Sequence, residues 1–207
     1  MNQITDRTRS VGILLFDDVE VLDFAGPFEV FSVTGRRHEA TPFTAFTVSE
    51  FRAAITARGG LNVLPAHDLA CPPIDILVIP GGFGTRREMH NVQLQSWIRE
   101  RASVAEIVLS VCSGALMLAT AGLLDGLTVT THRGALELLA QTAPSAHVSP
   151  GEKFCDNGHI VTSAGISAGI EASLHIVERL LGRDWATETA HYMEYDWKPG
   201  PAPAAHV

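Results

Sequence analysis

The order of apolar and helical segments predicts an α/β fold, a three-layer sandwich in which helices cover both faces of a mostly parallel sheet. Three short runs, at residues 11–16, 74–79 and 106–111, are apolar without helical periodicity. Such runs are typical of strands that are buried on both sides. Each run is followed by turn residues and then by a segment with helical spacing. This alternation of strand and helix favours helices on both faces of one sheet.

The first half of the chain supplies the first strands and helices of this alternation. The strand at residues 11–16 ends at Asp17-Asp18, and a helical segment follows within residues 19–33 before Gly35 stops it. Pro27 suits the first turn of that helix, which leaves Asp23 in the turn between strand and helix. Further strands are expected at 43–48, at 53–56 and 61–63 around the turn Gly59-Gly60, and at 74–79, before a helix at 92–101.

The second half continues the alternation. The strand at 106–111 leads into Cys112-Ser113-Gly114 and a helix at 115–124. A strand at 127–130, a helix at 133–141, a hairpin at 154–162 that turns at 156–158, and helices at 167–181 and 185–192 complete it. We expect a single domain over residues 1–207, with a core at about 10–195 and an irregular Pro/Ala-rich tail at 199–207.

Composition narrows the class of partner. Apolar residues make up 46% of the chain and charged residues 18%, a balance typical of a packed globular protein. The 15 Lys and Arg against 23 Asp and Glu give a net charge of −8, which disfavours a nucleic-acid partner. The N-terminus lacks a signal-peptide pattern, and no apolar run approaches the roughly 20 residues of a membrane span. We therefore expect a cytoplasmic protein that acts on a small molecule, without nucleic acid or membrane.

Of the three cysteines, Cys112 has the setting of a reactive thiol. The number of cysteines is odd and low, and no two of them form a CxxC pair. The cysteines therefore suggest neither a disulfide framework nor a zinc site. Cys71 precedes Pro72-Pro73 and Cys155 lies in a hairpin strand, so both read as structural. Cys112 lies between a buried strand and a helix, with small neighbours that permit a tight nucleophile elbow. The helix N-terminus there favours the thiolate, although a buried core cysteine is the alternative.

The other candidates gather at the same edge of the sheet. Asp23, the Gly-rich loop at 80–84, Cys112 and His132 each follow a predicted strand, and carboxyl ends of parallel strands meet at one edge. Asp23 would lie beside the thiol with a raised pKa and shuttle a proton; helix N-capping is its alternative role, and Glu20, Asp17 and Asp18 are rivals on the same loop. His132 could pair with the thiol or be structural.

The Gly-rich loop is a candidate for holding substrate. Backbone amides at Gly82 and Phe83, together with Ser113, could orient an oxyanion or a bound molecule, although for this motif taken alone a simple turn is the better explanation. The loop lacks the glycine spacing of nucleotide-binding loops.

Taken in chain order, these motifs resemble the ThiJ/PfpI superfamily, whose fold is the flavodoxin-like, class I glutamine amidotransferase-like sandwich. The resemblance rests on LDFAGPFEVF at 22–31, ILVIPGGFG at 76–84, SVCSGALMLATAGLLDG at 110–126, TVTTHRGALELL at 128–139 and IVTSAGISAGIEASLHIVERLLG at 160–182. Members of this superfamily share a fold but differ in activity.

Within the superfamily, LDxxGPxEVF at 22–31 and MEYDWKPGP at 193–201 look most like the isonitrile hydratase branch. That resemblance implies hydration of isonitriles to N-substituted formamides through a covalent thioimidate on Cys112, with Asp23 beside the nucleophile. It places Ser113 where the branch usually has Thr, His132 at the superfamily's histidine and Asp196 at a carboxylate of the branch. It also implies a homodimer that needs no metal or organic cofactor.

Other functions fit parts of the same pattern. Protease-like and deglycase-like members carry Glu in place of Asp23, which disfavours them, but glyoxalase or deglycase chemistry on small aldehydes with Cys112 and His132 remains the alternative enzyme. Ligand-sensing domains of AraC-type regulators share the LDxxGP pattern and continue into a helix-turn-helix domain. The length of 207 residues and the charge of −8 favour a stand-alone enzyme. A non-catalytic sensor, in which Cys112 binds a ligand or oxidises reversibly, is the third hypothesis.

Overall fold

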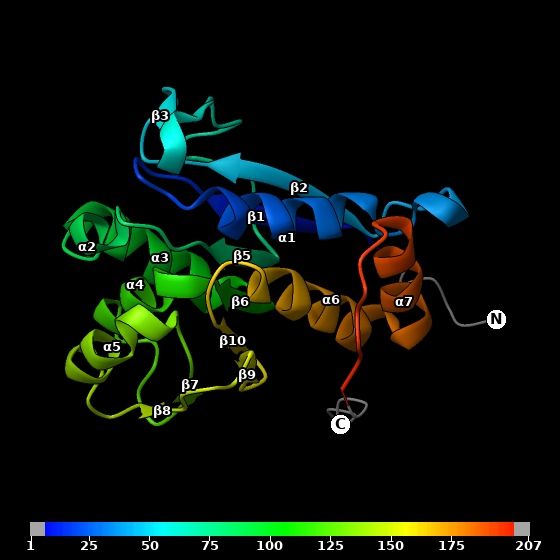
Figure 1. Cartoon of the computed structure of the whole chain (residues 1–207). Coiled ribbons are helices and arrows are strands. Elements are labelled where there is room, and N and C mark those ends of the chain that lie inside the picture. Colours follow the sequence, from blue (N-terminus) through cyan, green and yellow to red (C-terminus); the bar gives the residue numbers. More distant parts are fainter. Residues whose placement is uncertain (1–6, 201–207) are drawn as a thin grey trace.

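The computed structural model describes residues 7–200, and a mostly parallel six-stranded sheet forms its centre. Neighbouring strands follow the order β2 (Phe43–Val48), β1 (Arg9–Leu14), β5 (Ile76–Ile79), β6 (Ile107–Ser110), β10 (Ile160–Ser163) and β9 (Phe154–Asp156). Every pairing is parallel except that of β9 with β10, which are the two arms of the predicted hairpin. The predicted α/β class with a mostly parallel sheet is confirmed (Figure 1).

The helices pack around this sheet in two groups. In the first, α6 (Ala168–Leu181) packs against both α1 (Val21–Val33) and α7 (Arg183–Tyr192). In the second, α4 (Ala115–Thr120) contacts α2 (Thr85–Glu88), α3 (Val92–Val104) and α5 (Leu136–Thr142). The central strands β5 and β6 are buried at every residue, as expected for apolar runs covered on both sides. Within residues 7–200, no helix combines the length and the apolar character that crossing a membrane requires.

Two small sheets lie outside the main one. The strands expected at 53–56 and 61–63 form a short antiparallel pair, β3 (Ile55–Thr56) and β4 (Asn62–Val63). The strand expected at 127–130 shortens to β7 (Thr128–Val129), which pairs in parallel with β8 (His147–Val148). Sequence patterns predicted neither β8 nor α2, because elements of two to four residues are too short to show a period.

The first helix begins earlier than predicted. It starts at Val21, so Pro27 lies inside it rather than in its first turn, and Asp23 belongs to the first turn rather than to the preceding loop. Proline removes one backbone donor and is disfavoured inside a helix, which misled the assignment. Of the predicted irregular tail, residues 199 and 200 have no regular structure and 201–207 lie outside the described residues.

The strand order reverses at β1, whose two neighbours are β2 and β5. In open α/β sheets, ligands bind beyond the carboxyl ends of the strands at such a reversal. Helix α1 follows β1, the Gly-rich loop follows β5, and Cys112 follows β6. The topology therefore brings three separate chain segments to one edge of the sheet.

Candidate functional site

Cys112 lies on a strained turn immediately after β6. It opens a single 3₁₀ turn, Cys112–Gly114, and its φ of 56° is in the left-handed region that non-glycine residues rarely adopt. Its backbone N–H donates to Ala164 O at 3.1 Å, and its carbonyl accepts from Thr131 Oγ1 at 2.6 Å. These bonds hold the predicted nucleophile elbow in place from two other parts of the chain.

Glycine is required on both sides of this turn. A Cβ at Gly114 would come within 2.1 Å of Ile79 O, and a Cβ at Gly81 within 2.8 Å of Cys112 Cβ. Any side chain at Gly81 or Gly114 would therefore clash, and the absence of one lets the elbow pack directly against the end of β5 and the Gly-rich loop.

Asp23 meets Cys112 in the interior of the protein. Its side chain is 0% exposed, and Oδ2 accepts from Gly81 N–H at 3.0 Å. The carboxyl group lies beside Cys112, because a Cβ at Gly81 would come within 2.7 Å of Asp23 Oδ2 and 2.8 Å of Cys112 Cβ. Oδ1 has no hydrogen-bond partner among residues 7–200. The first turn of α1 thus aims a carboxyl group at the thiol, as the sequence predicted.

Burial raises the pKa of both Asp23 and Cys112. It raises the pKa of Asp23 from 3.8 to about 7, helped by the charge of Glu20, while the hydrogen bonds from Cys112, Gly81 and Ile166 oppose the rise. The direction of this shift is the one that the sequence predicts for Asp23. For Cys112, burial first and the Asp23 charge second raise the thiol pKa from 9.0 to about 12. The expectation of a thiolate favoured by the helix N-terminus was wrong, because α4 is short and desolvation outweighs it.

Two backbone amides face the thiol. The backbone N–H groups of Ser113 and Ile166 lower the pKa of Cys112, against the larger effects of burial and of the Asp23 charge. Ile166 was not predicted as a site residue. It follows β10 in the small-residue segment TSAGISAG and has a φ of 53°. A strained residue in a glycine- and serine-rich loop at a strand end was the signal that could have revealed it.

The Gly-rich loop supports the site rather than facing a ligand. Gly82 N–H donates to Ser113 Oγ at 3.0 Å, and Thr85 Oγ1 lies 3.1 Å from the same hydroxyl. The Gly82 amide is thus occupied by Ser113, contrary to the predicted role in orienting substrate. Phe83 is 63% exposed, with the guanidinium groups of Arg58 and Arg86 5.6 and 5.1 Å from its ring centre. It forms part of the surface around the site.

The remaining predicted residues form their hydrogen bonds and ion pairs with groups other than the thiol. His132 Nδ1 accepts from Gly134 N–H at 3.1 Å and caps the turn before α5, and its ring packs so closely on Gly165 that a Cβ there would lie 2.3 Å away. Its neighbour Thr131 donates to the Cys112 carbonyl. Asp196 follows α7, with its side chain 87% exposed and 3.5 Å from Lys198 Nζ. The structure thus places Asp196 on the surface.

The other two cysteines are buried and unpaired, and burial raises the pKa of both. Among residues 7–200, no group of three or more His, Cys, Asp or Glu side chains is arranged to hold a metal ion. The site therefore consists of a buried thiol with a raised pKa, a buried carboxyl group with a near-neutral pKa, and two backbone amides that lower the thiol pKa.

Known proteins resemble this chain in sequence and in fold. The DJ-1/PfpI family profile matches residues 9–179. The chain is 33% identical to an isonitrile hydratase of Pseudomonas putida over 93% of this chain and 79% of that protein. It is 26% identical to the HTH-type transcriptional regulator GbdR of Pseudomonas aeruginosa over 91% of this chain, and spans 51% of the regulator.

Solved structures agree with this assignment. A THiJ/PfpI family protein from Pseudomonas syringae superposes with a TM-score of 0.83 at 25% identity, covering 96% of this chain and 82% of that one. DJ-1beta of Drosophila melanogaster has a TM-score of 0.80 at 20% identity, covering 92% and 100%. The family profile spans most of the sequence, and the sheet and helices match those of the solved relatives. This chain belongs to the DJ-1/PfpI family.

Proposed function

We propose that this protein hydrates isonitriles, R–N≡C, to N-substituted formamides, with Cys112 as the nucleophile and Asp23 as the proton shuttle. The observation that carries the proposal is the buried pair itself: a thiol on a strained elbow, in contact with a carboxyl group whose pKa is about 7. Such a carboxyl group can both accept and return a proton near neutral pH. The 33% identity to an isonitrile hydratase supports the choice of substrate.

The first half of the reaction adds the thiol across the terminal carbon. Because the pKa of Cys112 is about 12, the thiol keeps its proton until substrate arrives. Asp23 takes this proton as sulfur bonds to the carbon, and then donates it to the same carbon to give R–N=CH–S–Cys112. The Ser113 and Ile166 amides stabilise negative charge on sulfur during the transfer.

The second half consumes one water. Asp23 accepts a proton from the water as the water oxygen bonds to the thioimidate carbon, and then donates that proton to the nitrogen to give R–NH–CH(OH)–S–Cys112. As the carbon–sulfur bond breaks, the hydroxyl proton passes through Asp23 to the sulfur, which regenerates the Cys112 thiol and releases R–NH–CHO. One isonitrile and one water give one formamide, and the protein regains its starting protonation.

A panel of alkyl and aryl isonitriles tests this proposal, with formamide measured by mass spectrometry. We expect turnover by the wild type, a loss of at least a thousandfold in Cys112→Ala, and an adduct on Cys112 equal to the whole mass of the isonitrile. Cys71→Ala and Cys155→Ala are matched controls that should retain turnover. Formamide production by Cys112→Ala at the wild-type rate would refute the proposed chemistry.

The regulator relative supports a second candidate, a ligand-sensing domain. GbdR matches this chain over 91% of its residues, and a thiol with a pKa of about 12 is a poor nucleophile at rest. In that case the isonitrile panel and methylglyoxal would show no turnover. A small molecule would instead raise the thermal midpoint of the wild type and of Cys112→Ala alike.

A further inference from the structure

A cavity of about 230 Å³ lies at the carboxyl edge of the sheet, beyond β1 and β2. Cys112, Asp23 and Ser113 do not line it. Gly84 packs against two of the lining residues, where a Cβ would come within 2.1 Å of Asp17 O and 2.8 Å of the Phe16 ring. The cavity therefore has a lining distinct from the thiol site, although both follow strand ends at the same edge of the sheet.

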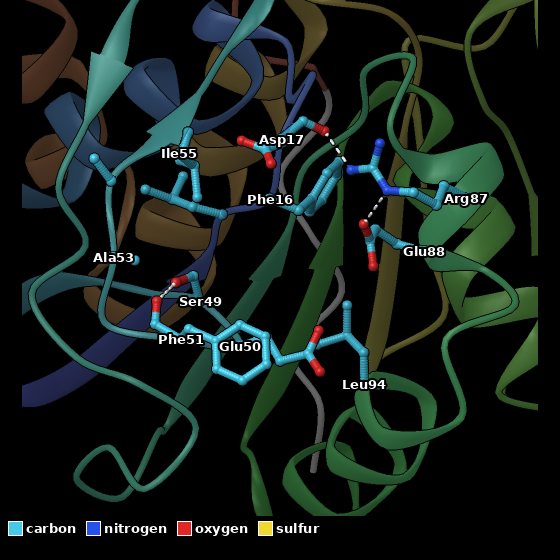
Figure 2. A pocket seen from close by; sticks show the side chains of 12 residues that line it. Phe16, Asp17, Ser49, Glu50, Phe51, Ala53, Ile55, Arg87, Glu88 and Leu94 are labelled. Atoms are coloured by element: carbon cyan, nitrogen blue, oxygen red, sulfur yellow. Dashed lines mark hydrogen bonds and ion pairs between the residues drawn. The ribbon is translucent and has the colours of Figure 1, made fainter.

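The walls of this cavity are largely apolar. Phe16, Ile55 and Leu94 contribute buried side chains, and Phe51 contributes a ring that is 68% exposed. Figure 2 shows the carboxylates of Glu50 and Glu88 entering the same space from different segments of the chain, with these apolar groups around them. Apolar walls with a few converging polar groups are typical of small-molecule sites.

Carboxylate groups outnumber basic groups around the cavity. Asn91 Nδ2 donates to Glu50 Oε2 at 2.8 Å and to Glu88 Oε2 at 3.1 Å, so one neutral amide holds two like charges together. Arg87 pairs with Glu88 at 2.7 Å, whereas Glu50 forms no ion pair with any residue from 7 to 200. Asp17 adds a third carboxylate to the lining. Two carboxylates held close in a half-buried site favour a cation between them.

We propose that this cavity binds a small organic cation, a primary ammonium group attached to an apolar chain or ring. The ammonium would donate to Glu50 and Glu88, and the apolar part would lie against Phe16 and Phe51. A volume somewhat below the usual range of about 300–1,000 Å³ suits a ligand of roughly ten heavy atoms. A bare metal ion would leave the aromatic walls unused. This site does not depend on the proposed hydratase function.

Binding of 2-phenylethylammonium to the full chain, measured by calorimetry at low salt, tests the proposal. We expect saturable binding, at least tenfold tighter than that of 2-phenylethanol, because only the amine can pair with the carboxylates. Glu50→Gln should weaken binding by about tenfold. Glu100→Gln, an exposed carboxylate on α3, is the matched control and should bind as the wild type does.

A second variant tests the cavity rather than its charge. Ala54 lines the cavity and is exposed, so Ala54→Trp should fold normally and still block binding. Amide shifts at residues 51–55 on titration would locate the ligand. Equal affinity for amine and alcohol, unchanged affinity in Glu50→Gln, or no binding of the amine up to its solubility limit would each overturn the proposal.

Discussion

Replacement of Asp23 by Asn should stabilise the protein in a pH-dependent way. The carboxyl group is fully buried and its pKa rises from 3.8 in the unfolded chain to about 7 in the fold. The native state therefore binds this proton more tightly, and stability is lost as pH rises from about 4 to 7. At 1.36 kcal/mol per pKa unit, the full cost above pH 7 is about 4 kcal/mol, of which about 2.5 kcal/mol is lost between pH 5 and pH 8.

Urea unfolding of the wild type and of Asp23→Asn at several pH values measures this cost. Asn cannot ionise but can still accept from Gly81 N–H, so other titrating groups cancel in the comparison. We expect the stability difference to grow in favour of Asn by about 2.5 kcal/mol between pH 5 and pH 8. Asp125→Asn, at an exposed position, should show no such growth. A flat difference for Asp23→Asn would refute the raised pKa, and with it the proton shuttle.

Three further substitutions test the contacts around the thiol. Gly81→Ala should lower turnover sharply and cost about 1–3 kcal/mol of stability, because its Cβ would lie 2.6 Å from Ser113 N; Gly200→Ala, in open space, should do neither. Ser113→Ala should lower the urea midpoint by leaving Gly82 N–H unpaired, a cost of about 1–3 kcal/mol, whereas Ser113→Thr keeps the hydroxyl and should not. His132→Ala should cost about 1 kcal/mol through loss of its cap, and His132→Asn should restore it. At pH 8, alkylation of Cys112 by iodoacetamide should be faster in Asp23→Asn, by about tenfold for each unit that the thiol pKa falls; an unchanged rate would mean that the carboxylate does not act on the thiol.

Sequence patterns were sufficient to predict which segments of the chain meet at the site. Strand ends at residues 16, 79 and 111 predicted that Asp23, the Gly-rich loop and Cys112 would meet, because a parallel sheet aligns its carboxyl ends. The structure brings these three segments together through Gly81, which touches both Asp23 and Cys112.

Properties that depend on burial and on individual backbone atoms were not predictable in this way. The thiol pKa depends on how completely Cys112 and Asp23 lose water, which no local pattern records. The direction of the Gly82 amide depends on the Ser113 hydroxyl. Ile166 acts through its backbone N–H, so its side chain carried no chemical signal, and the exposed position of Asp196 depends on the course of the chain after α7.

The contacts of the thiol site also determine when it can form during folding. The bond between Asp23 and Gly81 joins residues 58 apart in the chain, and Cys112 is held by Thr131 and by Ala164 beyond it. Contacts of such long sequence separation form late, because closing long loops precedes any gain from them. A growing chain on the ribosome thus exposes Cys112 long before Ala164 emerges to fix its backbone. The strained elbow is acquired only when β10 joins the sheet.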